Sequence, residues 1–325
     1  MSLLVYVWLG DHLPSWARIS LLLSQKNSGL STLLLSNRKV GAVPEVGKQV
    51  FLEDFYCQPD FIKSKYSTKK ASFRDAFWIK TTERFFVLEQ FMRKFSYESI
   101  FHAELDNLLF NISLLGANLD LVGSGLFCPR DSIARGIASL IYVNNIDALV
   151  ELSQEAVNSS NAGLNDMELL GQLLQNSKYY FSLPTEAAFN TESSAYLNYV
   201  KPDISSGIFD SAAIGQFLFG IDPKNIKGPL YNGFENENKG YDLWRLKYSI
   251  DIEKGIASIT NKDTSESKNL YNIHVHSKLF HQLIDSDHLK SILFTLDKGD
   301  KTLMSVNHRP NRFVRFLNKL TGNRH

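Results

Sequence analysis

The sequence predicts an α/β protein with a mostly parallel central sheet flanked by helices, and two observations support this class. Short β-prone apolar runs alternate with a stretch of helical periodicity near the N-terminus, which is the pattern of a strand–helix–strand unit and hence of parallel strands. The 325 residues are 44% hydrophobic and 21% charged, so the chain can bury a large core and is not disordered as a whole.

The N-terminal elements follow one another with short connections. Residues 3–9 form an apolar run that stops at Gly10, which predicts a buried strand ending in a turn. Residues 15–24 carry apolar side chains at helical spacing, and residues 31–36 and 50–53 again read as strands.

A long helix is predicted over residues 72–95, and a strand over residues 99–107 runs directly into acidic side chains. A further helix begins with Asn165 or Asp166 at its N-cap. Residues 202–238 are rich in Gly, Asn, Pro and Asp, which favours long functional loops over a second core. Residues 242–260 alternate like strands around a turn near Gly255.

Charge and cysteine content exclude several classes of protein. Lys and Arg number 35 against 34 Asp and Glu, a formal charge of +1, which argues against a nucleic-acid partner. Cys57 and Cys128 are too few for a disulfide scaffold or a zinc cluster and suit a reducing compartment. The sequence shows neither a signal peptide nor a membrane span. We therefore expect a soluble, cytoplasmic protein.

The strongest local signal for chemistry is the run His102-Ala-Glu104-Leu-Asp106-Asn107. In a strand, Glu104 and Asp106 would point to the same side. Two such carboxylates repel each other unless a cation lies between them, and Mg²⁺ or Mn²⁺ would in turn hold a diphosphate. The alternative is a solvent-exposed edge with two unrelated acids.

Two further runs carry candidate residues. His274 and His276 share one face of an extended segment, and Lys278 follows on the same side, which suggests a metal ligand with a phosphate clamp. The alternative is a strand with surface histidines. Asp210 precedes a stretch of small residues and could face a polar ligand, but helix capping by Asp is common and explains it equally simply.

These motifs resemble, in their order and spacing, the nucleotide-sugar glycosyltransferases of the GT-A fold. The resemblance rests on the strand-like opening of residues 5–10, on Phe77-Trp78 followed by Thr81-Thr-Glu-Arg84-Phe, and on the run from His102 to Asn107. It extends over about residues 3 to 280. Together with residues 209–216, the pattern is similar to uncharacterised bacterial glycosyltransferases associated with surface polysaccharides.

The resemblance implies roles for individual residues. Glu104-Leu-Asp106 would be a variant of the acidic element that binds the metal and the donor diphosphate, with Asn107 beside it. Asn165-Asp166-Met167 is similar to an element near the donor sugar or acceptor, and His274 or His276 would supply a metal or diphosphate ligand. It further implies one GT-A-like catalytic domain over residues 1–300, with a nucleotide-binding half (1–110) and an acceptor and donor-sugar half (111–300).

The leading functional hypothesis is therefore metal-dependent sugar transfer from a nucleoside diphosphate sugar to a glycan or lipid-linked acceptor. Lys278 and Arg84 would stabilise the departing diphosphate. Asp210 or Asp166 would deprotonate the acceptor if the reaction inverts configuration, and no base is needed if it retains it. A metal-dependent phosphoester hydrolase and a non-catalytic glycan-binding module are the alternatives.

The C-terminal tail, residues 301–325, carries basic residues and no acidic one, with apolar residues at helical spacing. A basic amphipathic helix suits peripheral contact with the inner face of the plasma membrane, where lipid-linked acceptors reside. The alternative is a helix packed on the body of the protein with a solvated basic face.

Overall fold

The computed structural model describes residues 2–67, 76–159, 163–190, 207–222 and 233–280. The predicted tail, residues 301–325, and the start of the predicted helix at residue 72 lie outside these ranges. None of the helices in the described part is long and apolar enough to cross a membrane.

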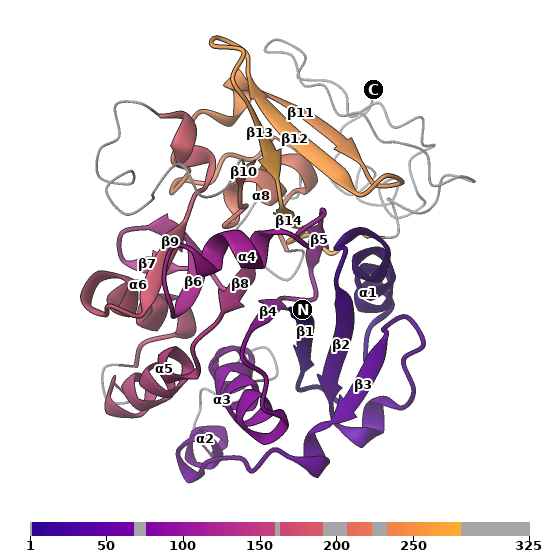
Figure 1. Ribbon diagram of the computed structural model, residues 1–325, viewed down its shortest axis with the longest axis vertical. Coiled ribbons are helices and arrows are strands. Elements are labelled where there is room, and N and C mark those ends of the chain that lie inside the picture. Colours follow the sequence, from indigo (N-terminus) through magenta and orange to yellow (C-terminus); the bar gives the residue numbers. More distant parts are fainter. Residues whose placement is uncertain (1, 68–75, 160–162, 191–206, 223–232, 281–325) are drawn as a thin grey trace, which may run out of the picture.

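The central sheet has a parallel half and a mixed half (Figure 1). The parallel half has the strand order β3-β2-β1-β4 and consists of β1 (Leu3–Trp8), β2 (Ser31–Ser36), β3 (Lys48–Phe51) and β4 (Ile100–Ala103). In the mixed half, β8 (Leu140–Val143) runs antiparallel to β4 and β6, while β9 runs parallel to β6. Its other strands are β6 (Leu126–Ser132), β7 (Arg135–Gly136) and β9 (Tyr180–Leu183). The predicted α/β class with a mostly parallel sheet is confirmed.

Helices cover both faces of this sheet because strand residues alternate between two apolar layers. On one side, Val5 of β1 packs in a cluster with side chains of α3 (Phe77–Phe95), α5 (Ile146–Asn158) and α6 (Asp166–Asn176). On the other side, Leu4 and Tyr6 pack with α1 (Ser15–Asn27) and α4 (Leu115–Asp120). The short helix α2 (Asp60–Tyr66) packs against α3.

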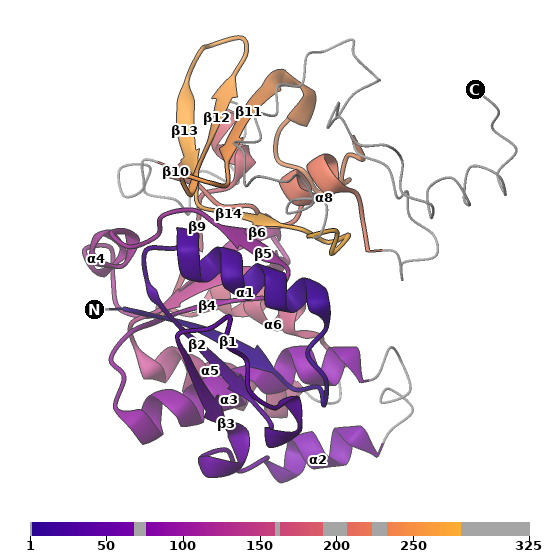
Figure 2. The same cartoon turned by 90° about the vertical axis from the view of Figure 1, so that its right-hand side faces the viewer.

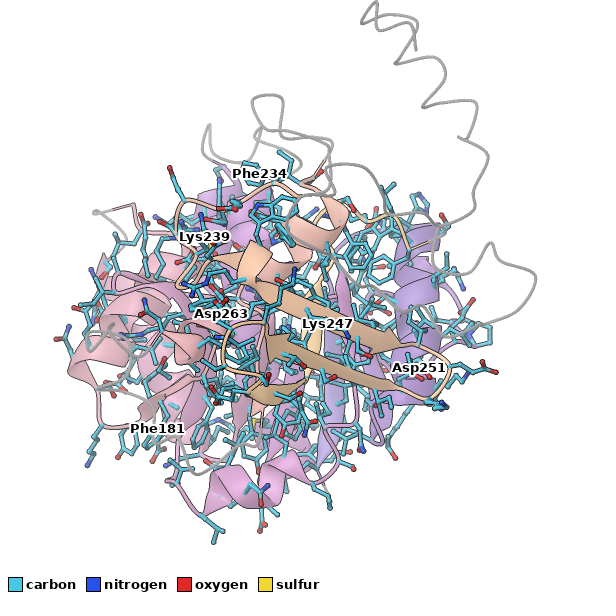
Figure 3. All side chains as sticks on the ribbon, turned by 90° about the horizontal axis from the view of Figure 1, so that it is seen from above. Phe181, Phe234, Lys239, Lys247, Asp251 and Asp263 are labelled. Atoms are coloured by element: carbon cyan, nitrogen blue, oxygen red, sulfur yellow. The ribbon has the colours of Figure 1, made fainter. Side chains whose placement is uncertain are left out.

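A smaller sheet lies beyond one edge of the central sheet (Figure 2). Its order is β10-β13-β12-β11, with β10 (Gly207–Ile208), β11 (Leu246–Asp251), β12 (Ile256–Asn261) and β13 (Ser267–Leu270). Figure 3 looks down on it, with Lys247 and Asp251 marking β11. The hairpin β11–β12 turns at Gly255, whose φ is +66°, as the sequence predicts.

The smaller sheet corrects one expectation. Ile208 of β10 and Phe217 of α8 (Ala213–Phe219) are fully buried, in one apolar cluster with β11, β12 and β13. The described part of residues 202–238 therefore contributes to a second core, whereas composition favoured loops. The apolar spacing within α8 outweighs the many Gly and Asn residues around it.

A two-stranded ladder connects the two sheets. β5 (Asn107–Leu109) pairs antiparallel with β14 (Asn272–His274), and the register places His274 opposite Asn107. The ladder thus brings the acidic run that follows β4 next to a segment from near the end of the described chain.

Several boundaries differ from the sequence-based expectation. The strand predicted over residues 50–53 begins earlier, as β3, and passes into a 3₁₀ turn, Leu52–Asp54. The strand predicted over residues 99–107 is two strands, β4 and β5, separated by a turn. The helix of the predicted N-cap is confirmed: Asn165 caps α6 in a capping box with Glu168.

Candidate functional site

The two acidic side chains of the central motif lie in the turn between β4 and β5, not in a strand as predicted. Glu104 donates its backbone N–H to Ser139 O at 3.0 Å, and its own carbonyl accepts from the Asn107 N–H at 3.2 Å. The turn, rather than the period-two alternation of a strand, therefore places Glu104 and Asp106 on the same side. The turn directly follows the carboxyl end of β4, next to parallel β1, which is where open α/β sheets bind ligands.

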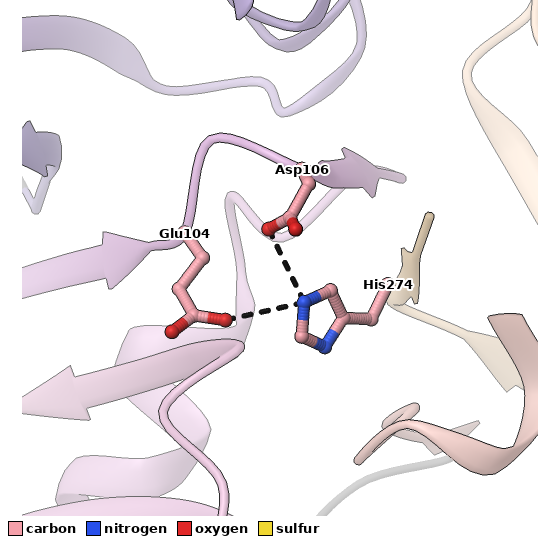
Figure 4. A group of neighbouring side chains, drawn as sticks. All are labelled: Glu104, Asp106 and His274. Carbon is pink, nitrogen blue, oxygen red and sulfur yellow. Dashed lines mark ion pairs between the residues drawn. The ribbon is translucent and has the colours of Figure 1, made fainter. Parts of the chain in front are cut away.

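His274 completes this group from the opposite strand of the ladder (Figure 4). Its Nε2 lies 3.2 Å from Glu104 Oε2 and 3.2 Å from Asp106 Oδ1. One ligand atom from each of the three residues lies within 4.8 Å of the others. The side chain of His274 is only 6% exposed, whereas those of Glu104 and Asp106 are 22% and 14% exposed, so the two carboxylates remain partly open to solvent.

The charges of this group are strongly coupled. Burial lowers the pKa of His274, but Asp106 and Glu104 outweigh it and raise that pKa to about 9. Burial raises the pKa of Asp106, yet the cationic His274 and Lys278 hold it well below its usual value. A proton on His274 thus balances two carboxylates where a divalent cation would fit.

The donor set suits a divalent cation. Two carboxylates and one imidazole are a mixed oxygen and nitrogen set, which Mn²⁺ accepts and Mg²⁺ tolerates. His274 Nδ1 lies 3.5 Å from the carbonyl of Ser211. A hydrogen bond there would leave Nε2 as the atom directed at the carboxylates, which is the usual orientation of a metal-binding histidine.

Lys278 adds a fixed positive charge beside Asp106. Its Nζ lies 3.2 Å from Asp106 Oδ2 and 3.4 Å from Asp222 Oδ2. Burial lowers the pKa of Lys278, but these two carboxylates raise it above its usual value, so the lysine stays charged. This is the cation that the sequence predicts as a phosphate clamp.

His276 lies against His274. Their ring centroids are 3.9 Å apart, and His276 Nε2 is buried without a hydrogen-bond partner among the described residues. The expected extended face covering His274, His276 and Lys278 is not present, because β14 ends at His274 and Lys278 has a φ of +58°. Burial and the nearby His274 lower the pKa of His276 well below its usual value. His276 is therefore neutral and lies beside the group of three, and its role as a metal ligand stays a prediction.

Arg84 and Asp166 meet beside Glu104. Arg84 NH1 pairs with Glu104 Oε1, and its NH2 lies 2.7 Å from Asp166 Oδ2. Asp166 also accepts a hydrogen bond from Thr81 Oγ1 at 3.0 Å. Both oxygens of Asp166 are thus engaged, which favours a positioning role over the predicted role as a base.

Asp210 is fully buried, and its carboxylate is hydrogen-bonded to backbone N–H groups. Its carboxylate accepts N–H groups from Ile214 at 3.0 Å, Gly215 at 2.8 Å and His274 at 2.8 Å. Burial raises the pKa of Asp210 to about 6 despite these bonds. The contacts are those of the structural alternative, in which Asp210 caps a helix; they also fix the backbone of His274.

Asn107 belongs to the buried support of the site. Its Nδ2 donates to Ser139 O at 2.9 Å, and its Oδ1 accepts from Asn272 Nδ2 at 2.8 Å. Asn272 in turn contacts Asp210. The predicted contact of Asn107 with a donor nucleotide would therefore compete with a network that holds β5 to β14.

Three supporting residues were not predicted from the sequence. Ser139 and Asn272 anchor the turn and the ladder, and Asp222 is the second partner of Lys278. Asn272 stands in the same short run as His274, so its amide side chain is the one signal that the sequence carries. Ser139 and Asp222 carry no local signal, because each meets the site only through the fold.

No protein-family model matches the sequence, and no curated protein matches it. Among solved structures, mouse xyloside xylosyltransferase 1 in its apo form aligns at 12% identity and a TM-score of 0.40, over 56% of this chain and 85% of the other. PaToxG glycosyltransferase aligns at 13% identity and a TM-score of 0.39, over 54% and 68% of the two chains. The galactosyltransferase LgtC, in complex with donor and acceptor sugar analogues, aligns at 11% identity and a TM-score of 0.37, over 62% and 85%.

These three proteins are named as transferases of sugars, the class that the sequence motifs resemble. At TM-scores of 0.40 and below, the likeness carries no conclusion about this chain. Its function has to be inferred from its own residues.

Proposed function

We propose that the protein is a metal-dependent glycosyltransferase that moves a sugar from a nucleoside diphosphate sugar to a glycan or lipid-linked acceptor. The observation that carries the proposal is the group of Glu104, Asp106 and His274 at the carboxyl end of β4. A divalent cation held there would neutralise charge on a departing diphosphate.

Lys278 provides the second element of this function. It is a charged group with three donors, and it lies within 3.2 Å of a proposed metal ligand, Asp106. A diphosphate bound at the metal would therefore meet a lysine that is already fixed and charged. In the transfer step, the bond between the sugar anomeric carbon and the diphosphate oxygen breaks, and a bond to the acceptor oxygen forms. The acceptor proton passes to a base if the configuration inverts, and to the departing diphosphate if it is retained.

Asp166 and Asp210, the two bases expected from the sequence, both have engaged carboxylates. Their contacts favour positioning roles. The resemblance to enzymes of bacterial surface polysaccharides motivates the acceptor class that we propose.

The first experiment is a thermal-shift screen of nucleoside diphosphates with and without Mn²⁺. A ligand that binds only the folded protein raises the apparent melting temperature, so we expect one nucleoside diphosphate to stabilise the protein only when Mn²⁺ is present. Asp106→Asn, which removes a charge and keeps the shape, should abolish this shift. A shift of equal size without Mn²⁺, or none with any nucleotide, would contradict the proposal.

A second measurement separates the proposal from the hydrolase alternative. With a nucleotide sugar that passes the screen, transfer gives a glycosylated acceptor, whereas hydrolysis gives free sugar or sugar phosphate whether or not an acceptor is present. Glycan binding without turnover would indicate the non-catalytic module.

A further inference from the structure

Arg84 connects two carboxylates that come from separate parts of the chain. It lies on the buried face of α3, and its guanidinium pairs with Glu104 in the β4–β5 turn and with Asp166 in the first turn of α6. The side chains of Arg84 and Asp166 are 9% and 3% exposed. This is a buried ion-pair network and not a surface contact.

Both terminal nitrogens of Arg84 pair with carboxylates, whereas its buried Nε has no hydrogen-bond partner among the described residues. Burial lowers the pKa of Arg84, but Glu104 and Asp166 outweigh it and raise that pKa. A buried guanidinium needs such partners, because removing one of them would leave an uncompensated charge. Arg84 therefore remains in place with or without a ligand nearby.

The pairing with Arg84 also gives the two carboxylate oxygens of Glu104 different partners. Oε1 faces Arg84, while Oε2 lies 3.2 Å from His274 Nε2. A carboxylate free to rotate could offer either or both oxygens to a cation. Glu104, in contrast, presents Oε2 alone toward Asp106 and His274.

Asp166 is anchored just as firmly. Thr81, one turn before Arg84 on α3, donates to Asp166 Oδ1 at 3.0 Å, and the capping box of Asn165 and Glu168 fixes the start of α6. Asp166 thus holds the second arm of the guanidinium fork from a rigid helix terminus.

We infer that Arg84 and Asp166 are positioning residues of the cation site: they hold Glu104 so that it offers one oxygen to a divalent cation. This inference rests on the proposed function, because it requires that a cation binds at Glu104, Asp106 and His274. It gives Arg84 a different role from the diphosphate contact expected from the sequence, because its NH1 and NH2 groups already face carboxylates. It also explains why a guanidinium stands here: a lysine cannot hold two carboxylates through one planar fork.

The test is the dissociation constant of Mn²⁺, measured by the loss of the free Mn²⁺ electron paramagnetic resonance signal. Wild type is compared with Arg84→Met, Arg84→Lys and Asp166→Asn, and each protein is kept well below its own melting temperature. Loss of residues that orient metal ligands typically weakens metal affinity by about 10- to 100-fold. We expect a loss in this range for Arg84→Met, and a smaller loss for Asp166→Asn.

Arg84→Lys is the decisive variant. It keeps the charge and loses the fork, so it should recover thermal stability relative to Arg84→Met while Mn²⁺ affinity stays well below that of wild type. A merely structural role would move the melting temperature and leave the affinity of the folded protein unchanged.

Arg93→Ala is the matched control. Arg93 lies on the same helix, and its side chain is 61% exposed in a pair with Glu89, so its loss should not alter Mn²⁺ affinity. If all Arg84 and Asp166 variants bind Mn²⁺ as wild type does while Asp106→Asn does not, the positioning role is wrong and the cation site stands. If wild type itself binds no Mn²⁺, the cation site and the proposed function fail together.

Discussion

Two clusters around acidic side chains lie close together along the chain, one around the buried Glu83 and one around the partly buried Glu104 and Asp106, and they are balanced in opposite ways. Glu83, on α3, accepts hydrogen bonds from Tyr56 OH at 3.1 Å, Gln58 Nε2 at 2.6 Å and Tyr66 OH at 2.6 Å. All three donors are neutral, and burial together with Glu83 raises the pKa of Tyr56 above its usual value. The hydrogen-bonding capacity of the Glu83 carboxylate is therefore satisfied by neutral side chains that carry no exchangeable charge.

The cluster of Glu104 and Asp106 is balanced by cations instead, namely Arg84, His274 and Lys278. One of these charges, the proton on His274, can leave. Burial of a carboxylate therefore does not by itself indicate a ligand site. A cluster in which one balancing charge is an exchangeable proton can accept a metal ion. A cluster in which neutral tyrosine and glutamine side chains satisfy the carboxylate stabilises the fold instead.

The largest change in Mn²⁺ affinity at the cluster of Glu104 and Asp106 is expected from Asp106→Asn. It removes one of the two carboxylates while Lys278 keeps Asp222 as a partner. Mn²⁺ affinity should fall by more than about 100-fold, beyond the loss typical of residues that only orient ligands. Isothermal titration with Mn²⁺ measures it, with the equally conservative Asp263→Asn, in an exposed pair with Arg245, as control. A wild-type affinity in Asp106→Asn would remove the distinction between the two clusters.

The next effect is the pH dependence of metal binding. Because the pKa of His274 is raised to about 9, Mn²⁺ must displace a proton from it below that pH. Affinity should therefore fall about tenfold between about pH 8.5 and about pH 7.5. Lys278 stays charged, Asp106 stays ionised and His276 stays neutral in this window.

The same raised pKa makes the stability of the metal-free protein fall as pH rises, whereas metal affinity increases. A histidine whose pKa is raised on folding contributes stability that is complete below about pH 6.5 and is lost as pH rises through about 9. Unfolding of metal-free protein should thus become easier over that range, and His274→Gln should remove both dependences. A metal affinity that does not change with pH would show that Mn²⁺ displaces no proton from His274.

A smaller effect is expected from Gly215→Ala in α8. The added Cβ would lie 1.9 Å from the His274 carbonyl oxygen, so α8 and β14 must separate. Overpacking of this kind costs about 1–3 kcal/mol of stability, and the shift of His274 should weaken Mn²⁺ binding by about tenfold. Gly116→Ala in α4 is the control, since its nearest neighbour is the tip of Ser2 at 2.9 Å, which can turn away. Unchanged metal binding in Gly215→Ala would show that the contact of α8 with β14 does not set the site.

The smallest effect on the metal site is expected from Glu83→Gln. The new amide nitrogen would face donors and leave at least one of them unsatisfied, which costs about 1–3 kcal/mol of stability. Mn²⁺ affinity should not change, because Glu83 belongs to the neutral cluster. Urea unfolding and Mn²⁺ titration on the same protein separate the two readouts. A clear loss of Mn²⁺ affinity would mean that the two clusters act as one.

Features that depend on near neighbours could be predicted from the sequence alone. The strands of residues 3–8 and 31–36, helix α1 and the cap of α6 follow from apolar spacing and from the side chain of Asn165. The acidic pair and the later histidines could also be picked out, because those residue types together are rare in a buried segment.

Which of these residues meet depends on the packing of segments that are distant in the sequence. Packing places the Nε2 of His274 against both carboxylates, joins Arg84 to Glu104 and Asp166, and engages the carboxylate of Asp210 with backbone groups. The Asn107–Asn272 hydrogen bond spans 165 residues, and no local pattern encodes such a partner. Periodicity and capping depend on residues one or two turns away, whereas the site depends on where a packed core places distant segments.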